Sequence, residues 1–201
     1  DITEITASAL PAFDLLVGGF PCQAFSIAGR RGGFADTRGT LFFQIARILK
    51  SQRPRLCLLE NVKGLLSHAG GATFATIVRT LDELGYDLQW QVLNSRDFGV
   101  PQNRERVFVV GHIRGTARPE VFPFTASHRE DRWHVARQRA GTQDENNIVD
   151  SLRRLTPVEC ERLQGFPDRW TAGVSDTQRY RCLGNAVTVP VIAAIAQRLL
   201  G

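Results

Sequence analysis

Two residues of the kind that do covalent chemistry each follow an apolar run that is typical of a buried strand. Cys22 comes directly after Pro21, in a loop that leaves the run 14–18 through two glycines. A thiol in such a loop is held stiffly, and a nearby arginine or helix N-terminus would lower its pKa and make it a nucleophile. Glu60 follows the run 55–59 and would place a carboxyl group at the end of a second buried strand. Taken singly, an inert cysteine and an ordinary capping acid are the simpler interpretations.

A third cluster of polar residues precedes the apolar run 107–110 and contains Gln102, Arg104 and Arg106. Because side chains in a strand repeat with period two, Arg104 and Arg106 would present two guanidinium groups on one face. Such a pair suits a phosphate, a carboxylate or a base edge. On its own, the cluster is equally typical of a solvated strand end.

An alternation of strand-like and helix-like segments would position these groups, and it indicates an α/β protein. In open α/β sheets, ligands bind at the carboxyl ends of the strands, which is where Cys22 and Glu60 are expected. Gly85 stands where helices use a left-handed cap. The predicted strands are 14–18, 55–59, 87–93 and 106–113, and the spacing of apolar residues predicts helices within 41–49 and 74–84.

The pattern breaks in residues 116–150, which have no sustained period and are interpreted as an irregular excursion. Order returns at Thr156, followed by Pro157 at the first helical position and by Glu159 in the place of a capping-box acid. The nearly all-apolar segment 187–200 predicts a C-terminal helix, which we expect to return and pack on the first part of the chain.

Composition limits the class of protein. The 201 residues are 43% hydrophobic and 22% charged, which excludes a disordered chain, and the net charge of +5 is a modest bias toward polyanions. No apolar run approaches the roughly 20 residues of a membrane helix. The four cysteines form no C-x-x-C pair, so we expect reduced thiols, no metal site and a cytoplasmic location. Because the chain has no methionine, we expect it to be a piece of a longer protein.

Taken together, the segments resemble the ordered motif set of the bacterial DNA cytosine-C5 methyltransferases. The resemblance rests on several blocks in one order, which makes coincidence very improbable, and it covers nearly everything except residues 116–150. It implies a Rossmann-like methyltransferase fold with an open, mostly parallel sheet that lacks its first strands. The blocks are 18–26 (GGFPCQAFS), 36–43 (DTRGTLFF), 60–62 (ENV), 102–106 (QNRER), 155–167 (LTPVECERLQGFP) and 184–187 (GNAV), with 1–3 (DIT) at the start.

The resemblance implies a covalent mechanism on a cytosine that has been flipped out of the duplex. Cys22 would add to C6 of the ring, and Glu60, protonated through a raised pKa, would relieve the charge near N3. Arg104 and Arg106 would orient the base and the acid, and S-adenosylmethionine would supply the methyl group for C5. The implied cofactor residues are Asp1, Ile2, Pro21, Leu41 and Asn185, and the implied DNA-contacting residues are Gln23, Ser26, Arg30, Arg31, Asn61, Val62 and Gln102.

The chain departs from the family pattern in two places. The N-terminal block with a Phe-x-Gly-x-Gly loop for the cofactor is absent, so we expect the chain alone to bind S-adenosylmethionine weakly or not at all, and to need a complementing N-terminal fragment. The excursion is much shorter than the family's target-recognition region. The expected divisions are a catalytic core over 1–115, the shortened region or loop over 116–150, and the C-terminal segment 151–201 with its returning helix.

The leading hypothesis is therefore the catalytic portion of a DNA (cytosine-5-)-methyltransferase of the restriction-modification type. It would act on double-stranded DNA in the bacterial cytoplasm, associated with the nucleoid when on DNA, without a membrane or a metal. One alternative is an inactive or accessory DNA-binding subunit of a split methyltransferase, although such a scaffold has no need of Cys22, Glu60, Arg104 and Arg106. Another alternative is methylation of RNA. A generic cysteine hydrolase ranks last, because no histidine has a matching context.

Overall fold

The structure is a computed structural model that describes residues 2–21, 41–117, 119–124 and 154–201. The chain divides into two compact units, which are described separately below. Unit 1 comprises Asp1–Leu93 and Glu105–Pro123, and unit 2 comprises Asn94–Arg104 and Phe124–Gly201. The divisions expected from the sequence, and the packing of the C-terminal helix on the first part of the chain, stay predictions.

Unit 1 is built on a four-stranded sheet in the order β1-β2-β4-β3. Its strands are β1 (Leu15–Gly19), β2 (Leu56–Val62), β3 (Tyr86–Asn94) and β4 (Glu105–Ile113). All four predicted strands are therefore present.

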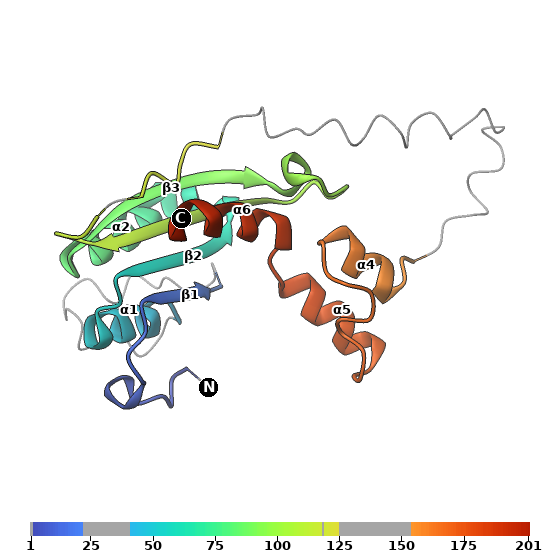
Figure 1. Cartoon of the computed structure of the whole chain (residues 1–201), viewed down its shortest axis with the longest axis horizontal. Helices are drawn as coiled ribbons and strands as arrows, with labels where there is room; N and C mark the ends of the chain where they lie inside the picture. The colour runs from blue at the N-terminus through green and yellow to red at the C-terminus, as the bar shows by residue number, and fades with distance from the viewer. Residues whose placement is uncertain (1, 22–40, 118, 125–153) are drawn as a thin grey trace. The chain divides into compact units, whose positions relative to one another are not determined.

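The sheet is mixed rather than mostly parallel in the part of the chain that is described. β1 pairs with β2 in parallel, and β2 pairs with β4 antiparallel. Figure 1 draws β3 and β4 as arrows that point in opposite directions. The physical reason is the connection: residues 95–104 are too few for the crossover of a dozen or more residues that parallel neighbours need.

Two amphipathic helices supply the other half of the core of unit 1. They are α1 (Leu41–Gln52) and α2 (Ala72–Glu83), at the positions that the apolar spacing predicts. Phe42 and Leu81 are fully buried, and the ring of Phe20 lies 5.3 Å from that of Phe42, centroid to centroid. Gly85 has φ of 88°, which confirms the predicted left-handed cap after α2.

The centre of the sheet encloses a thiol. Cys57 on β2 is paired with Gly111 on β4 and has no exposed surface. Burial raises the pKa of this thiol to about 12, against a smaller opposite effect of a hydrogen bond with the backbone of Gly111. A Cβ atom at position 111 would lie 2.7 Å from the Sγ atom of Cys57, so glycine is required there. Cys57 thus acts as a small apolar residue of the core.

Unit 2 contains three α-helices among its described residues. α4 (Pro157–Leu163) begins with the predicted capping box, in which Thr156 and Glu159 bond each other's backbone. α5 (Asp176–Asn185) is not among the predicted elements, because its sequence is polar and only Leu183 is buried. α6 (Val189–Leu200) confirms the C-terminal helix, with Val191, Ile195 and Leu199 along one buried stripe.

Contrary to the expectation from the sequence, the stretch Asp176–Leu200 is long and apolar enough to cross a membrane, by length and composition alone. The backbone is extended at Ala186 and at Thr188, so α5 and α6 are separate helices. One such stretch is weak evidence for a membrane span.

Candidate active site

The carboxyl ends of β1 and β2 meet at one edge of the sheet of unit 1. The two strands are parallel, and their register pairs Gly19 with Glu60. A Cβ atom on residue 19 would lie 3.3 Å from the Oε2 atom of Glu60, so the absence of a side chain lets the carboxylate lie against β1. Phe20 and Pro21 follow Gly19 and precede Cys22 in the sequence.

Glu60 and Arg106 form an ion pair across β2 and β4. The Nε atom of Arg106 lies 2.9 Å from the Oε1 atom of Glu60, with side chains 22% and 18% exposed respectively. The register explains this contact: Val62 is opposite Arg106, so Arg106 and Glu60 are diagonal neighbours on one face of the sheet. Arg106 also donates to the carbonyl of Glu105 at 2.9 Å, which fixes its guanidinium group from a second side.

Asn61 ties this edge together from within. Its Nδ2 atom donates to the carbonyl of Phe20 at 2.8 Å, and its Oδ1 atom accepts from the amide of Val62 at 2.8 Å. The residue is 4% exposed, so these two bonds satisfy a buried amide. Asn61 thereby holds the end of β1 immediately before Pro21. Its predicted contact with DNA stays a prediction, as does that of Val62, which is 41% exposed.

Arg104 is placed differently from the sequence expectation of two guanidinium groups on one strand face. It precedes β4 and lies in unit 2, where its Nη2 atom donates to the carbonyls of Gly184 and Ala186 at 3.2 Å and 2.8 Å. The period-two argument does not apply to Arg104, because the strand begins only at Glu105. Gln102 is also in unit 2, and its buried Oε1 atom has no hydrogen-bond partner in the described part of the chain.

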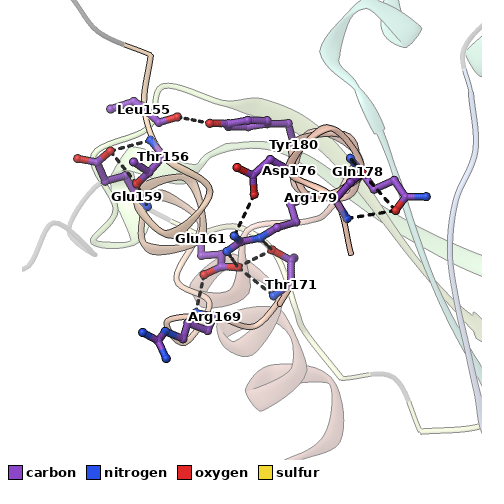
Figure 2. A network of polar contacts seen from close by, with 11 residues as sticks. Leu155, Thr156, Glu159, Glu161, Arg169, Thr171, Asp176, Gln178, Arg179 and Tyr180 are labelled. Carbon is purple, nitrogen blue, oxygen red and sulfur yellow. Dashed lines mark hydrogen bonds and ion pairs between the residues drawn. The ribbon is translucent and has the colours of Figure 1, made fainter. Parts of the chain in front are cut away.

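Unit 2 contains a second arginine–glutamate pair that the sequence interpretation did not single out. Glu161 on α4 is fully buried and lies 3.2 Å from Arg179 on α5 (Figure 2). Its carboxylate also accepts from the amides of Arg169 and Thr171, at 2.7 Å and 2.9 Å, and from the Thr171 hydroxyl. Burial by itself would raise the pKa of Glu161, but these donors together lower it to about 2.

The two backbone amides that donate to Glu161 come from the loop after α4, where Arg169 has φ of 63°. Such a left-handed conformation is uncommon for a residue with a side chain, and here the buried carboxylate holds it. The sequence offered one signal for this buried pair, which was the presence of a glutamate, Glu161, inside the motif 155–167. Nothing in that pattern indicated which of its two glutamates is buried.

Several predicted site residues lie outside the described residues. These are Asp1, Cys22, Gln23, Ser26, Arg30 and Arg31.

The predicted cofactor residues that are described fit S-adenosylmethionine in part. Ile2 packs against the core of unit 1, Leu41 is 40% exposed at the start of α1, and Pro21 is exposed after β1. These apolar side chains can contact an adenine ring but cannot bond a ribose or a carboxylate. Asn185 is exposed at the end of α5 in unit 2 and carries an amide; its contact with the cofactor stays a prediction.

Comparison with known proteins identifies the family of this chain. The family model described as "C-5 cytosine-specific DNA methylase" matches residues 1–132 and 115–201. The chain therefore belongs to the C-5 cytosine-specific DNA methylases, which use S-adenosylmethionine as methyl donor. The fold is Rossmann-like, as predicted.

The similar curated proteins are type II methyltransferases. M1.ScrFI of Lactococcus lactis subsp. cremoris is 39% identical over 100% of this chain and 65% of its own length. M.DsaV of Dactylococcopsis salina is 38% identical over 100% of this chain and 72% of its own length. The chain thus spans about two thirds of the length of these relatives.

Solved structures agree on the fold. The Dnmt2 methyltransferase of S. pombe superposes with a TM-score of 0.67 at 20% identity, covering 100% of this chain and 84% of that one. A variant of DNMT2 from Spodoptera frugiperda gives 0.68 at 18% identity, with the same coverage.

Proposed function

We propose that this chain carries the catalytic groups of a DNA (cytosine-5-)-methyltransferase of a restriction-modification system. The observation that carries the proposal is the Glu60–Arg106 pair at the carboxyl end of β2, beside the end of β1, which Cys22 follows closely in the sequence. An acid that is paired with an arginine near the carboxyl end of a strand supports the proposal, because ligands bind at that edge of the sheet in α/β proteins.

The roles of the residues follow from the chemistry of cytosine. C5 is a poor nucleophile, so the Cys22 thiolate forms a bond to C6 and makes C5 enamine-like. Glu60 donates a proton at N3 and so neutralises the charge that this addition leaves on the ring. Arg106 holds the carboxyl group of Glu60 in place. After methylation the C5 proton leaves to a base and the C6–S bond breaks. N3 returns its proton to Glu60, and the Cys22 thiolate is regenerated. Bound S-adenosylmethionine supplies the electrophilic methyl group.

The cofactor site is proposed to be completed by residues beyond these 201. The described apolar contacts lack groups for the ribose and the carboxylate, and a segment with a Phe-x-Gly-x-Gly loop would supply them. That segment is either part of the same polypeptide or a separate complementing fragment. We propose that the enzyme acts in the cytoplasm and is associated with the nucleoid while it is bound to DNA.

Trapping of the covalent adduct tests this function. The chain, supplied with the N-terminal segment and S-adenosylmethionine, is offered duplex DNA that carries 5-fluorocytosine in place of cytosine. Because fluorine cannot leave as a proton does, a covalent protein–DNA product should accumulate on a denaturing gel. Cys22→Ser should give none, and Cys160→Ser, which changes a thiol far from the edge in sequence, should trap normally. Trapping by the Cys22 variant, or no trapping by the unaltered chain, would contradict the proposal.

A competition between duplex DNA and RNA in the same assay addresses the alternative substrate. We expect adduct formation with DNA and none with RNA of the same sequence. Preferential trapping of RNA would replace the DNA substrate in this proposal.

A further inference from the structure

Arg104 makes the contacts of a helix cap. The last carbonyl groups of an α-helix have no partner within the helix, and an arginine from elsewhere can satisfy them. α5 ends at Asn185, and the Nη2 atom of Arg104 donates to the carbonyls on both sides of that residue, at Gly184 and Ala186. A cation at this end also complements the negative end of the helix dipole.

The backbone of Arg104 is itself held firmly. Its amide donates to the Oδ1 atom of Asn94 at 3.2 Å, and its carbonyl accepts from the amide of Ser95 at 3.0 Å. The same Asn94 oxygen accepts from the amide of Arg96. The guanidinium group therefore extends from a fixed point, so that its position determines where the helix end lies.

A second contact from the same segment holds the link between α5 and α6. The Oγ atom of Ser95 lies 2.7 Å from the Oγ1 atom of Thr188, and each residue is 3% exposed. Thr188 is the N-cap residue of α6, and its hydroxyl makes no cap bond to that helix. The segment 94–104 therefore contacts the chain on both sides of Asn185: at Gly184 and Ala186 through Arg104, and at Thr188 through Ser95.

From this geometry we propose that Arg104 is a positioning residue for Asn185 and that it does not contact the flipped base. The proposal rests on the proposed function and on the cofactor contact that the family resemblance implies for Asn185. Asn185 is exposed while the carbonyls around it are fixed, so its side-chain amide is presented to a ligand on a rigid backbone. Loss of the guanidinium group should loosen this backbone and weaken binding of the cofactor, whereas Arg106 should act on the rate of the chemical steps.

The order of residues along the chain is a further reason to assign different roles to Arg104 and Arg106. Arg104 is two residues before Arg106, which is paired with Glu60. One short stretch thus carries an arginine for the acid and an arginine for the helix end. The two side chains have different partners, so their substitution should have separable effects.

Amide hydrogen exchange on the chain tests whether Arg104 holds the end of α5, and it does not require an active enzyme. In Arg104→Ala, the amides of residues 184–189 should exchange about tenfold faster or more, because two carbonyls lose their partner. Amides of β2 and β4 should exchange as before. Arg96→Ala is the matched control, since Arg96 is an exposed arginine of the same segment. Exchange at 184–189 within twofold of the unaltered chain, or an equal increase throughout, would overturn the proposal. If Arg104→Ala does not fold, Arg104→Gln is judged by the same criteria.

Cofactor binding to the complete enzyme tests the second half of the proposal. Arg104→Ala should weaken the Kd for S-adenosylmethionine about tenfold and leave kcat at saturating cofactor within about threefold. Arg104→Lys, which keeps a donor and a charge, should recover part of the affinity. A fall in kcat with unchanged cofactor affinity would assign Arg104 to the base instead. If the unaltered enzyme transferred no methyl group, the proposed function would fail. The exchange experiment would still show whether Arg104 holds the end of α5.

Discussion

The two units each contain a glutamate paired with an arginine, and the two pairs differ in what surrounds them. Glu60 is 18% exposed and lies at an edge of the sheet, with its Oε1 atom 2.9 Å from Arg106. Glu161 is fully buried, and its oxygens accept from two backbone amides, a hydroxyl and Arg179. The same two residue types therefore produce an accessible acid in unit 1 and a structural anchor in unit 2.

The comparison shows that the number of hydrogen bonds a carboxylate accepts indicates its role better than the presence of a paired arginine does. A carboxylate whose acceptor sites are filled by a buried loop has no capacity left for a substrate, and its removal leaves several donors without a partner. A carboxylate with remaining solvent access can still exchange a proton. The predictions below separate these roles, beginning with the largest expected effect.

Glu60→Gln should lower the rate of methyl transfer by about 10²- to 10⁴-fold, because the amide cannot donate a carboxylic proton at N3. The measurement is single-turnover transfer of labelled methyl groups to duplex DNA, with the melting temperature as a check on folding. Glu105→Gln is the matched control, since Glu105 is an exposed neighbour of Arg106. Near-normal turnover of the Glu60 variant would show that Glu60 is not a catalytic acid.

Glu161→Gln should destabilise unit 2 by about 3–5 kcal/mol, because Arg179 and the loop amides lose a buried charge. Chemical denaturation followed by circular dichroism measures this change. Glu159→Gln in the same helix keeps an acceptor for the capping box and should cost under about 1 kcal/mol. Equal stability of the two variants would show that burial does not distinguish these acids.

Acid should weaken unit 2 through Glu161 in a defined range of pH. The folded-state pKa of about 2 lies below the ordinary value of 4.5, so the unfolded chain binds the proton first. The stabilisation is complete above about pH 4.5 and is lost as the pH falls toward 2, by an amount on the order of 3 kcal/mol. Denaturation midpoints between pH 6 and pH 2.5 should fall less steeply in Glu161→Gln. A parallel decline in both chains would disprove the assignment.

The smallest effect is expected at the exposed pair of Lys63 and Glu105. Their charged atoms are 3.0 Å apart, but the side chains are 57% and 44% exposed. Lys63→Met should change stability by less than about 1 kcal/mol, and by less still at high salt. A loss of stability as large as that of Glu161→Gln would mean that an exposed ion pair can stabilise the fold as much as the buried one.

The sequence predicted the strands, the main helices and the Glu60 edge because each depends on local patterning. Apolar runs that end in Glu60, the helical spacing after Leu41 and the capping box at Thr156 all lie within a few residues. Membership in the methylase family, its fold and its cofactor were predicted from short motifs in order, and the comparisons confirm them.

What could not be predicted depends on distant contacts. α5 is polar and is recognisable only by the capping box of Ser175 and Gln178. The partners of Arg104 lie about 80 residues further along the chain, so period-two reasoning about its neighbours misplaced it. The mixed sheet arises from the short connection before β4, and the burial of Glu161 comes from a loop that follows its helix. The roles of the individual site residues stay predictions.

The enclosure of Cys57 gives the molecule an internal reporter. A thiol with no exposed surface and a pKa near 12 is protected from alkylating reagents as long as the sheet stays closed. Its labelling rate therefore measures how often unit 1 opens. Mass spectrometry can resolve that label from labels on other cysteines. The labelling of Cys57 in any variant at the Glu60 edge therefore shows whether the sheet of unit 1 is still folded.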